Sequence, residues 1–252
     1  MDRRLAVVPR AGLVKLEVLD RRLRAEGKRA IAWDYRNLYF SWPFISAGGA
    51  YSIGKHQGLY DLADLGIDTP AAIAGVEGIK QLLDSGVLPR DSDYAGMMAA
   101  FKRGELAMMI NGPWAWNELR AAGIDIALAS IPGPGADRPG RPFVGIQAAA
   151  LNHHSPNQEA ARRFLEDYLS SPADLRQIDQ DKPLGVPANL ELMQEAQRDP
   201  LIQASFDAAM AGEIMPDIPE MKRFWGLFNG RFDAMLQGAR RLHYPMQGQA
   251  VN

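Results

Sequence analysis

Several large aromatic side chains stand where a ligand could reach them. They fall in or beside expected loops and helix starts rather than in the apolar stripes of helix interiors: Tyr39, Trp42, Tyr94, Trp114 and Trp225. An aromatic ring has a flat, apolar face, and tyrosine and tryptophan carry a polar group at one edge. This combination suits pyranose rings, whose C–H faces are apolar and whose rims carry hydroxyls, so the pattern favours a sugar-binding surface.

The alternative is that such rings belong to the hydrophobic core, where large aromatic side chains are usually buried. We expect core positions for four aromatic residues: Trp42, Phe44, Trp116 and Phe224. For Trp114 and Trp225 the sequence leaves both interpretations open.

Motifs for catalysis, metal binding and nucleotide binding are weak. The chain has no Cys, which excludes disulfides, thiolate zinc sites and a cysteine nucleophile. No GxxxxGKS or GxxxxGKT loop is present, and Gly133-Pro134-Gly135 has Arg138 where a dinucleotide loop needs its third glycine. His153-His154 would need further ligands to hold a metal, so a solvated loop is favoured there. Asp34 and Asp93 could in principle serve glycoside hydrolysis, but nothing in the flanking sequence marks either carboxylate as an acid or a base.

The composition is that of an ordinary globular protein. The 252 residues, 47% hydrophobic and 23% charged, are enough to bury a core as one large domain or two smaller ones. With 28 Lys and Arg against 30 Asp and Glu, the net charge of −2 argues against a basic nucleic-acid footprint. No apolar run approaches the roughly 18 residues that a membrane span needs. The run that starts at Leu5 is interrupted at Pro9, so we expect no signal peptide, and the chain as written would stay in the compartment where it is made, such as the cytoplasm.

Expected helices and strands alternate along the chain. Apolar spacing and capping residues predict helices at 13–26, 69–85, 94–103, 189–197, 200–211 and 219–237, and one more after a capping box at Ser155. Apolar runs predict strands at 30–33, 106–110, 124–131 and 143–151. This alternation implies an α/β domain with a mainly parallel sheet, in which ligands bind at the carboxyl ends of the strands. Asn111-Gly112-Pro113-Trp114 directly follows such a strand.

Several longer segments carry a specific resemblance. They read YFSWP at 39–43, FKRGELAM at 101–108, INGPWAW at 110–116, RPFVG at 141–145, DKPLG at 181–185 and GEIMP at 212–216. In this order they resemble the bacterial periplasmic maltose/maltodextrin-binding proteins, the solute-binding components of ABC importers. The resemblance covers roughly residues 16–237.

The resemblance implies a periplasmic-binding-protein-like (type II) α/β lobe with a mainly parallel sheet and the N-terminal lobe largely missing. We expect residues 11–143 and 201–237 to form the C-terminal lobe. Residues 144–200 would be the hinge crossover and a remnant of the N-terminal lobe, and 238–252 a divergent tail. The implied function is maltose or maltodextrin binding in a truncated importer component. The alternative is a vestigial or frame-disturbed fragment without effective sugar binding.

Six residues match sugar-contacting or cleft-lining positions of the family: Tyr39, Phe40, Tyr94, Trp114, Met215 and Trp225. Trp114 and Trp225 match its stacking tryptophans. Two positions depart from the pattern, because Asn37-Leu38 stands where the family has an acidic residue and a proline, and Asn229 stands where it has an arginine. The loss of the acidic residue puts one charge-assisted sugar hydrogen bond in doubt.

The resemblance also implies partners and a location. Expected partners are the sugar and the membrane subunits of an ABC importer, with no catalysis, no cofactor, no metal and no nucleic acid. The family location is periplasmic. We further expect residues 144–200 to self-associate, since Phe164, Leu165, Tyr168 and Leu169 line one helix face that in the family is covered by the missing lobe.

Overall fold

The computed structural model describes residues 12–131, 133 and 139–236. Contacts between residues divide the chain into two compact units. Unit 1 is built mainly from Asn111–Leu128 and Gly145–Asp207, and unit 2 from Ala6–Ile110, Ala129–Val144 and Ala208–Asn252. This division groups 111–128 with 145–207, whereas the resemblance assigned 11–143 to one lobe. The lobe boundaries therefore remain a prediction.

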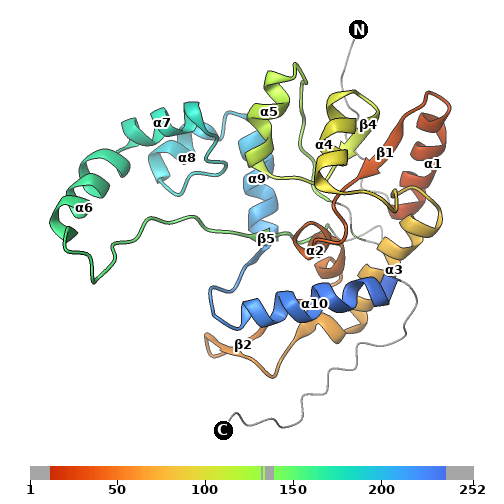
Figure 1. Ribbon diagram of the computed structural model, residues 1–252, viewed down its shortest axis with the longest axis horizontal. Coiled ribbons are helices and arrows are strands. Elements are labelled where there is room, and N and C mark those ends of the chain that lie inside the picture. Colours follow the sequence, from red (N-terminus) through yellow and green to blue (C-terminus); the bar gives the residue numbers. More distant parts are fainter. Residues whose placement is uncertain (1–11, 132, 134–138, 237–252) are drawn as a thin grey trace. The chain divides into compact units, whose positions relative to one another are not determined.

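The elements of each unit are labelled in Figure 1. Unit 2 holds helices α1 (Gly12–Arg24), α2 (Leu38–Ser46), α3 (Pro70–Asp84), α4 (Tyr94–Lys102) and α10 (Met221–Leu236), with the 3-10 turn η1 (Gly66–Asp68). Its strands are β1 (Arg29–Ala32), β2 (Gly54–His56), β3 (Leu59–Asp61), β4 (Leu106–Met109), β5 (Phe143–Val144) and β6 (Glu213–Ile214). Unit 1 holds η2 (Pro113–Ala115), α5 (Trp116–Ala121), α6 (Gln158–Phe164), the π-helical turn η3 (Leu165–Leu169), α7 (Pro172–Asp181) and α8 (Leu190–Ala196). Helix α9 (Pro200–Ala211) begins in unit 1 and ends in unit 2.

The expected α/β class with parallel pairing is confirmed. β1 pairs with β4 and β5 pairs with β6 in parallel, while β2 and β3 form an antiparallel hairpin. In the described ranges each pair stands alone, so the sheets are shorter than the sequence suggested. None of the helices in the described part of the chain is long and apolar enough to cross a membrane.

Of the predicted strands, one is absent from the structure and another was predicted too long. Residues 124–131 form no strand in the structure, although Ile126 and Leu128 pack against the cluster around Trp116. An apolar run does not by itself supply the ladder of backbone hydrogen bonds that a strand needs, and no strand pairing includes this segment within the described residues. The strand expected at 143–151 is limited to Phe143–Val144, because its partner β6 has only two residues.

The capping box expected at Ser155 is also wrong. Helix α6 begins at Gln158, and Asn157 occupies its N-cap position without a capping side-chain hydrogen bond. Ser155 Oγ instead accepts a hydrogen bond from the Asn157 backbone N–H at 3.1 Å. This local turn competes with the helix for the serine hydroxyl, so the helix starts later than the motif indicates.

The core of unit 2 is aromatic and centred on α2. Trp42 and Phe44 are fully buried, and Phe44 stacks on Trp33 with 5.1 Å between ring centroids. Helix α3 approaches α2 so closely that a Cβ at Gly75 would lie 2.5 Å from the Phe44 carbonyl oxygen. Only glycine allows that approach. Helix α10 adds the buried ring of Phe224, so the core positions predicted for Trp42, Phe44 and Phe224 are confirmed.

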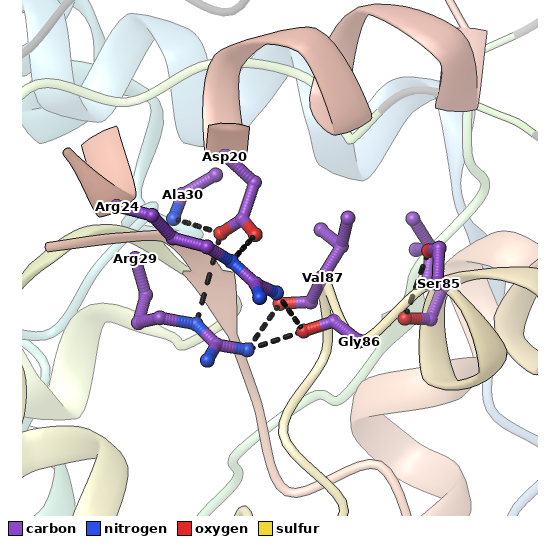
Figure 2. A network of polar contacts seen from close by, with 8 residues as sticks. Asp20, Arg24, Arg29, Ala30, Ser85, Gly86 and Val87 are labelled. Atoms are coloured by element: carbon purple, nitrogen blue, oxygen red, sulfur yellow. Dashed lines mark hydrogen bonds and ion pairs between the residues drawn. The ribbon is translucent and has the colours of Figure 1, made fainter. Parts of the chain in front are cut away.

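A buried carboxylate ties α1 to β1. Asp20 on α1 is 2% exposed and accepts hydrogen bonds from the Ala30 backbone N–H at 2.9 Å and from Arg24 Nε at 2.5 Å (Figure 2). Arg29 Nε lies 3.7 Å from the same carboxylate. Both guanidinium groups also donate to the carbonyl oxygen of Gly86, which follows α3. Removing one partner of a buried, hydrogen-bonded ion pair typically costs about 3–5 kcal/mol, so this network fixes the packing of α1, β1 and the end of α3.

Unit 1 has a smaller core. One cluster of buried residues in it consists of Trp116, Met193, Leu201 and Ile202, and Trp116 is thereby confirmed as a core residue. The helical stretch from α6 through η3 to α7 contains no buried residue. In this respect α6, η3 and α7 differ from every helix of the aromatic core described above.

Candidate functional site

The site is built at the carboxyl end of the β5–β6 pair. Phe143 and Val144 of β5 lie beside Glu213 and Ile214 of β6, and the pairing continues where the Met215 backbone N–H donates to the Val144 carbonyl oxygen at 3.1 Å. The carboxyl ends of parallel strands are a preferred place for ligands in α/β folds. Met215, which is half-buried, therefore follows directly on a position suited to ligand binding.

Side-chain hydrogen bonds hold this strand pair in unit 2. A carboxylate oxygen of Glu213 accepts hydrogen bonds from the backbone N–H and the hydroxyl of Ser52, at 2.9 and 2.6 Å. The hydroxyl of Ser46, at the end of α2, donates to the Arg141 carbonyl oxygen at 2.6 Å. The short strands are thus fixed to α2 and to the segment before β2.

Five aromatic rings form a continuous row in unit 2, which we call the aromatic row. Tyr94 contacts Phe40 with 6.1 Å between ring centroids, and Phe40 contacts Tyr39 edge-on at 5.7 Å. Tyr39 stacks on Phe143 at 6.4 Å, and Phe143 meets Trp225 edge-on at 5.4 Å. Tyr39, Tyr94 and Trp225 are half-buried, whereas Phe40 and Phe143 are buried. Two buried rings therefore support three rings that keep part of their surface accessible.

Helix caps place the two tyrosines. The side chain of Asn37 accepts a hydrogen bond from the Tyr39 backbone N–H at 3.1 Å, which caps α2. The side chain of Asp93 accepts from the Gly96 backbone N–H at 2.7 Å, which caps α4. Each tyrosine consequently lies in the first turn of its helix. Asn37, which replaces the acidic residue of the resembled family, is engaged in this cap.

Burial sets the protonation of the groups nearby. Burial raises the pKa of the Tyr39 phenol above its ordinary value, so the hydroxyl remains protonated at neutral pH. Burial also raises the pKa of Asp34, and the negative charge of Asp93 raises it further. A hydrogen bond from the Asn37 backbone lowers this pKa but does not cancel the rise. Asp34 and Asp93 are thus electrostatic neighbours, but Asp93 already serves as the α4 cap.

Two predicted residues are not members of the aromatic row as its ring contacts define it. Trp114 belongs to unit 1, where it is 48% exposed in η2, and its ring folds back over Gly112, whose Cβ would lie 2.2 Å from the ring. Met215 lies in unit 2 beside the β5–β6 pair but not among the ring contacts. The structure thus brings together four of the six predicted residues: Tyr39, Phe40, Tyr94 and Trp225.

Sequence reasoning missed Phe143, the ring that joins Tyr39 to Trp225. The residue lies in the RPFVG segment and was interpreted only as part of an apolar strand. Its buried side chain gives no local sign of contact with a half-buried tyrosine and a half-buried tryptophan from two different helices. These rings come together only through contacts between segments that are far apart in the sequence.

Other candidate sites involve none of the predicted residues. A cavity of about 350 Å³ in unit 1 is lined mainly by apolar side chains of 124–128 with Arg120 at its edge. Among the described residues no group of three or more His, Asp or Glu side chains is arranged to hold a metal ion. The aromatic row is therefore the arrangement that best combines accessible rings with a strand-end position.

Comparison with known proteins gives one family profile and several curated relatives. A family profile described as bacterial extracellular solute-binding protein matches residues 12–204. The maltotriose-binding protein of Pyrococcus abyssi is 27% identical over 83% of this chain and 46% of its own length. A maltooligosaccharide ABC transporter solute-binding lipoprotein of Streptococcus pneumoniae is 26% identical over 80% of this chain and 48% of its own length. The galactooligosaccharide-binding protein of Bacillus subtilis is 22% identical over 76% and 47%. The chain spans about half the length of the curated relatives that it matches.

Proposed function

Because the chain belongs to the bacterial extracellular solute-binding protein family, we propose that it binds maltose or maltodextrin on the aromatic row of unit 2. The observation that carries the proposal is the row itself. Tyr39, Tyr94 and Trp225 offer partly accessible rings, and Phe40 and Phe143 hold them in place from behind. A row of rings suits a linear chain of pyranoses, since each sugar presents an apolar C–H face.

Protonated hydroxyls complete the chemistry. The Tyr39 phenol, kept neutral by burial, can donate a hydrogen bond to a sugar hydroxyl. The relatives named above bind maltotriose, maltooligosaccharides or galactooligosaccharides, so a pyranose oligosaccharide is the class that these names share. Stacking supplies the affinity that is common to these sugars, and polar groups at the ring edges supply the selectivity.

The proposed role is binding and not catalysis. Asp93 caps α4, and the raised pKa of Asp34 follows mainly from its burial, so neither carboxylate has an arrangement specific to bond cleavage. The proposed partners are the membrane subunits of an ABC importer, and the proposed location is the extracellular or periplasmic side of the membrane. Both proposals rest on the family and on the names of the relatives.

Affinity should be modest for the family. Asn37 is neutral and already caps α2, which removes one charge-assisted hydrogen bond from the family pattern. We therefore expect a weaker sugar affinity than in a relative that keeps the acidic residue.

Calorimetric titration with maltotriose tests the proposal, with tryptophan fluorescence as a second readout. Trp225→Ala should abolish the measured binding because it removes an accessible ring of the row. Tyr60→Ala is the matched control, since Tyr60 lies on β3 and its ring packs against Lys55 outside the row. This variant should bind as the parent does.

Three outcomes would contradict the proposal. Absence of binding to maltotriose and to a galactooligosaccharide by the folded chain would favour the alternative of a fragment without effective sugar binding. Unchanged binding by Trp225→Ala would exclude the aromatic row as the site. Release of new reducing ends from maltotriose would show that the protein is an enzyme.

A further inference from the structure

A half-buried carboxylate stands at the carboxyl end of the β1–β4 pair. Asp34 follows Ala32, the last residue of β1, by two positions, at the end of a parallel pair where α/β folds often bind ligands. Within the described residues, no side chain donates a hydrogen bond to this carboxylate. A carboxylate that is partly removed from water is stabilised by groups that donate hydrogen bonds to it, so Asp34 is suited to receive such donors from a ligand.

Hydrogen bonds hold the end of β1 against the segment that leads into α4. The Ser92 hydroxyl donates to the Trp33 carbonyl oxygen at 2.7 Å. The Tyr35 hydroxyl donates to the Arg90 carbonyl oxygen at 2.8 Å. Trp33 and Tyr35 flank Asp34 in the sequence, so these bonds fix the backbone on both sides of the carboxylate. Asp34 therefore lies beside the start of α4, the helix that carries one end of the aromatic row.

The start of α2 is tied to Asp34 as well. The Asn37 backbone N–H donates to the Asp34 carbonyl oxygen at 3.2 Å, which closes a turn directly before α2. Helices α2 and α4 carry Phe40 and Tyr94 in their first turns, and these two rings lie 6.1 Å apart between centroids. The two helix starts thus converge, and Asp34 is held by short-range contacts to both. They form the Tyr94 end of the aromatic row.

We propose that the Asp34 carboxylate accepts hydrogen bonds from hydroxyls of the sugar that stacks at the Tyr94 end of the row. This inference rests on the proposed function, because it takes the row as the sugar site. Stacking recognises the apolar face of a pyranose, whereas the hydroxyls on its rim need polar partners. An ionised carboxylate only accepts hydrogen bonds, and those that it accepts are about twice as strong as bonds between neutral groups. Asp34 is therefore a specificity-determining residue that selects sugars with free hydroxyls at this position.

The charges that face Asp34 make this role depend on pH. Burial raises the pKa of Asp34, and the charge of Asp93 at the start of α4 raises it further. The Asn37 backbone hydrogen bond and the charge of Arg36 lower the pKa but do not cancel the rise. Asp34 therefore takes up a proton at a higher pH than an ordinary aspartate does. Protonation removes the charge that strengthens the hydrogen bonds, so sugar affinity should fall as the pH falls through the pKa of Asp34.

Calorimetric titration with maltotriose at several pH values is the first test, with circular dichroism to verify folding at each pH. Asp34→Asn should bind about tenfold more weakly than the parent at pH 7, because it loses a charged acceptor. The parent should lose affinity as the pH is lowered from about 7 to about 4, and the variant should not. Asp68→Asn is the matched control, since Asp68 is an exposed carboxylate in η1 of the same unit and outside the row. This variant should follow the parent at every pH.

NMR titration of the Asp34 carboxyl carbon, with and without maltotriose, tests the contact directly. If the ionised form binds sugar more tightly, saturating maltotriose must lower the pKa of Asp34, because the coupling between proton and sugar is reciprocal. A residue with a purely structural role would show no such shift.

The possible results separate this inference from the proposed function. Absence of maltotriose binding by the folded parent would overturn both. If Trp225→Ala abolishes binding but Asp34→Asn binds as the parent does at every pH, only the role of Asp34 is excluded. A pKa of Asp34 that maltotriose leaves unchanged would exclude that role as well.

Discussion

Helices α3 and α7 start in the same way but are stabilised differently. Each is capped by a hydroxyl side chain followed by proline at the first helical position: Thr69-Pro70 for α3 and Ser171-Pro172 for α7. Helix α3 then buries an apolar stripe that includes Ile79 and Leu82, whereas α7 buries no residue. Starting signals of equal quality thus lead to helices with very different tertiary support, because support comes from what the helix packs against.

The same contrast separates the aromatic residues. The rings of unit 2 contact one another in extended sets, and Phe228 on α10 is 1% exposed between Phe224 and Phe232. In α6 and η3 the pair Phe164 and Tyr168 makes one stacking contact and remains mostly exposed. Unit 2 uses its aromatic residues to fill a core and to present a row of rings. Helix α6 and the turn η3 keep theirs at the surface.

Truncating one phenylalanine in each region should give the largest difference. Phe228→Ala should lower the free energy of unfolding by about 3–5 kcal/mol, since it leaves a cavity between two stacked rings. Phe164→Ala should change it by at most about 0.5 kcal/mol, because the side chain is already exposed. Urea denaturation of dilute protein, followed by circular dichroism and by hydrogen exchange in α3, measures both. Equal losses for the two variants would show that Phe164 has tertiary support that the structure does not contain.

Much of this contrast could be predicted from the sequence. The Thr69 cap and the apolar spacing after it placed α3 within one residue of its observed bounds, since capping and periodicity are local. The burial of Trp42, Phe44, Trp116 and Phe224 was also predicted, because large aromatic side chains beside apolar runs are usually core. The family and the α/β class were recognised from ordered segments.

What the sequence did not predict depends on distant partners. The apolar run at 124–131 predicted a strand, but such a run cannot say whether a neighbouring strand is present, and no strand pairing includes this segment within the described residues. Phe143 joins the aromatic row through contacts with α2 and α10, far away in sequence. The roles of the six predicted sugar-binding residues came from resemblance, and they stay predictions until the titration is done.

Removing the N-cap side chains of α3 and α7 should give a smaller difference in stability than truncating the phenylalanines. Thr69→Ala should lower the free energy of unfolding by about 1 kcal/mol, since Thr69 Oγ1 accepts a hydrogen bond from the Ala72 backbone N–H and α3 belongs to the core of unit 2. Ser171→Ala removes the equivalent bond from the Asp174 backbone N–H. Its effect should be confined to faster hydrogen exchange within α7, because that helix buries no residue. A comparable loss of global stability from both changes would mean that α7 is packed as firmly as α3.

The smallest expected difference is in the response of the two units to acid. In unit 2, burial raises the pKa of Asp34. The charge of Asp93 adds to this rise, and the Asn37 backbone hydrogen bond opposes it. In unit 1, the hydrogen bond from the Arg176 guanidinium lowers the pKa of Glu195. The two carboxylates thus shift in opposite directions, one through removal from water and the other through a surface ion pair.

Because the pKa values of Asp34 and Glu195 shift in opposite directions, their contributions to the free energy of unfolding change in opposite directions with pH. In the folded state Asp34 keeps its proton at pH values above the ordinary carboxyl pKa. Its contribution to the stability of the folded state is therefore complete below the ordinary pKa and is lost as the pH rises through the folded pKa. Glu195 contributes fully above its ordinary pKa and loses that contribution as the pH falls through its lowered folded value. Asp34→Asn should therefore make stability rise more steeply with pH between about pH 3 and 6, and Glu195→Gln should make it rise less steeply. Both effects should be slight, because Glu195 is exposed and because the Asn37 backbone hydrogen bond opposes the effect of burial on Asp34. NMR titration of the two carboxyl carbons measures the shifts directly, and a lowered pKa for Asp34 would mean that pairing, not burial, dominates in unit 2 as it does on the surface of unit 1.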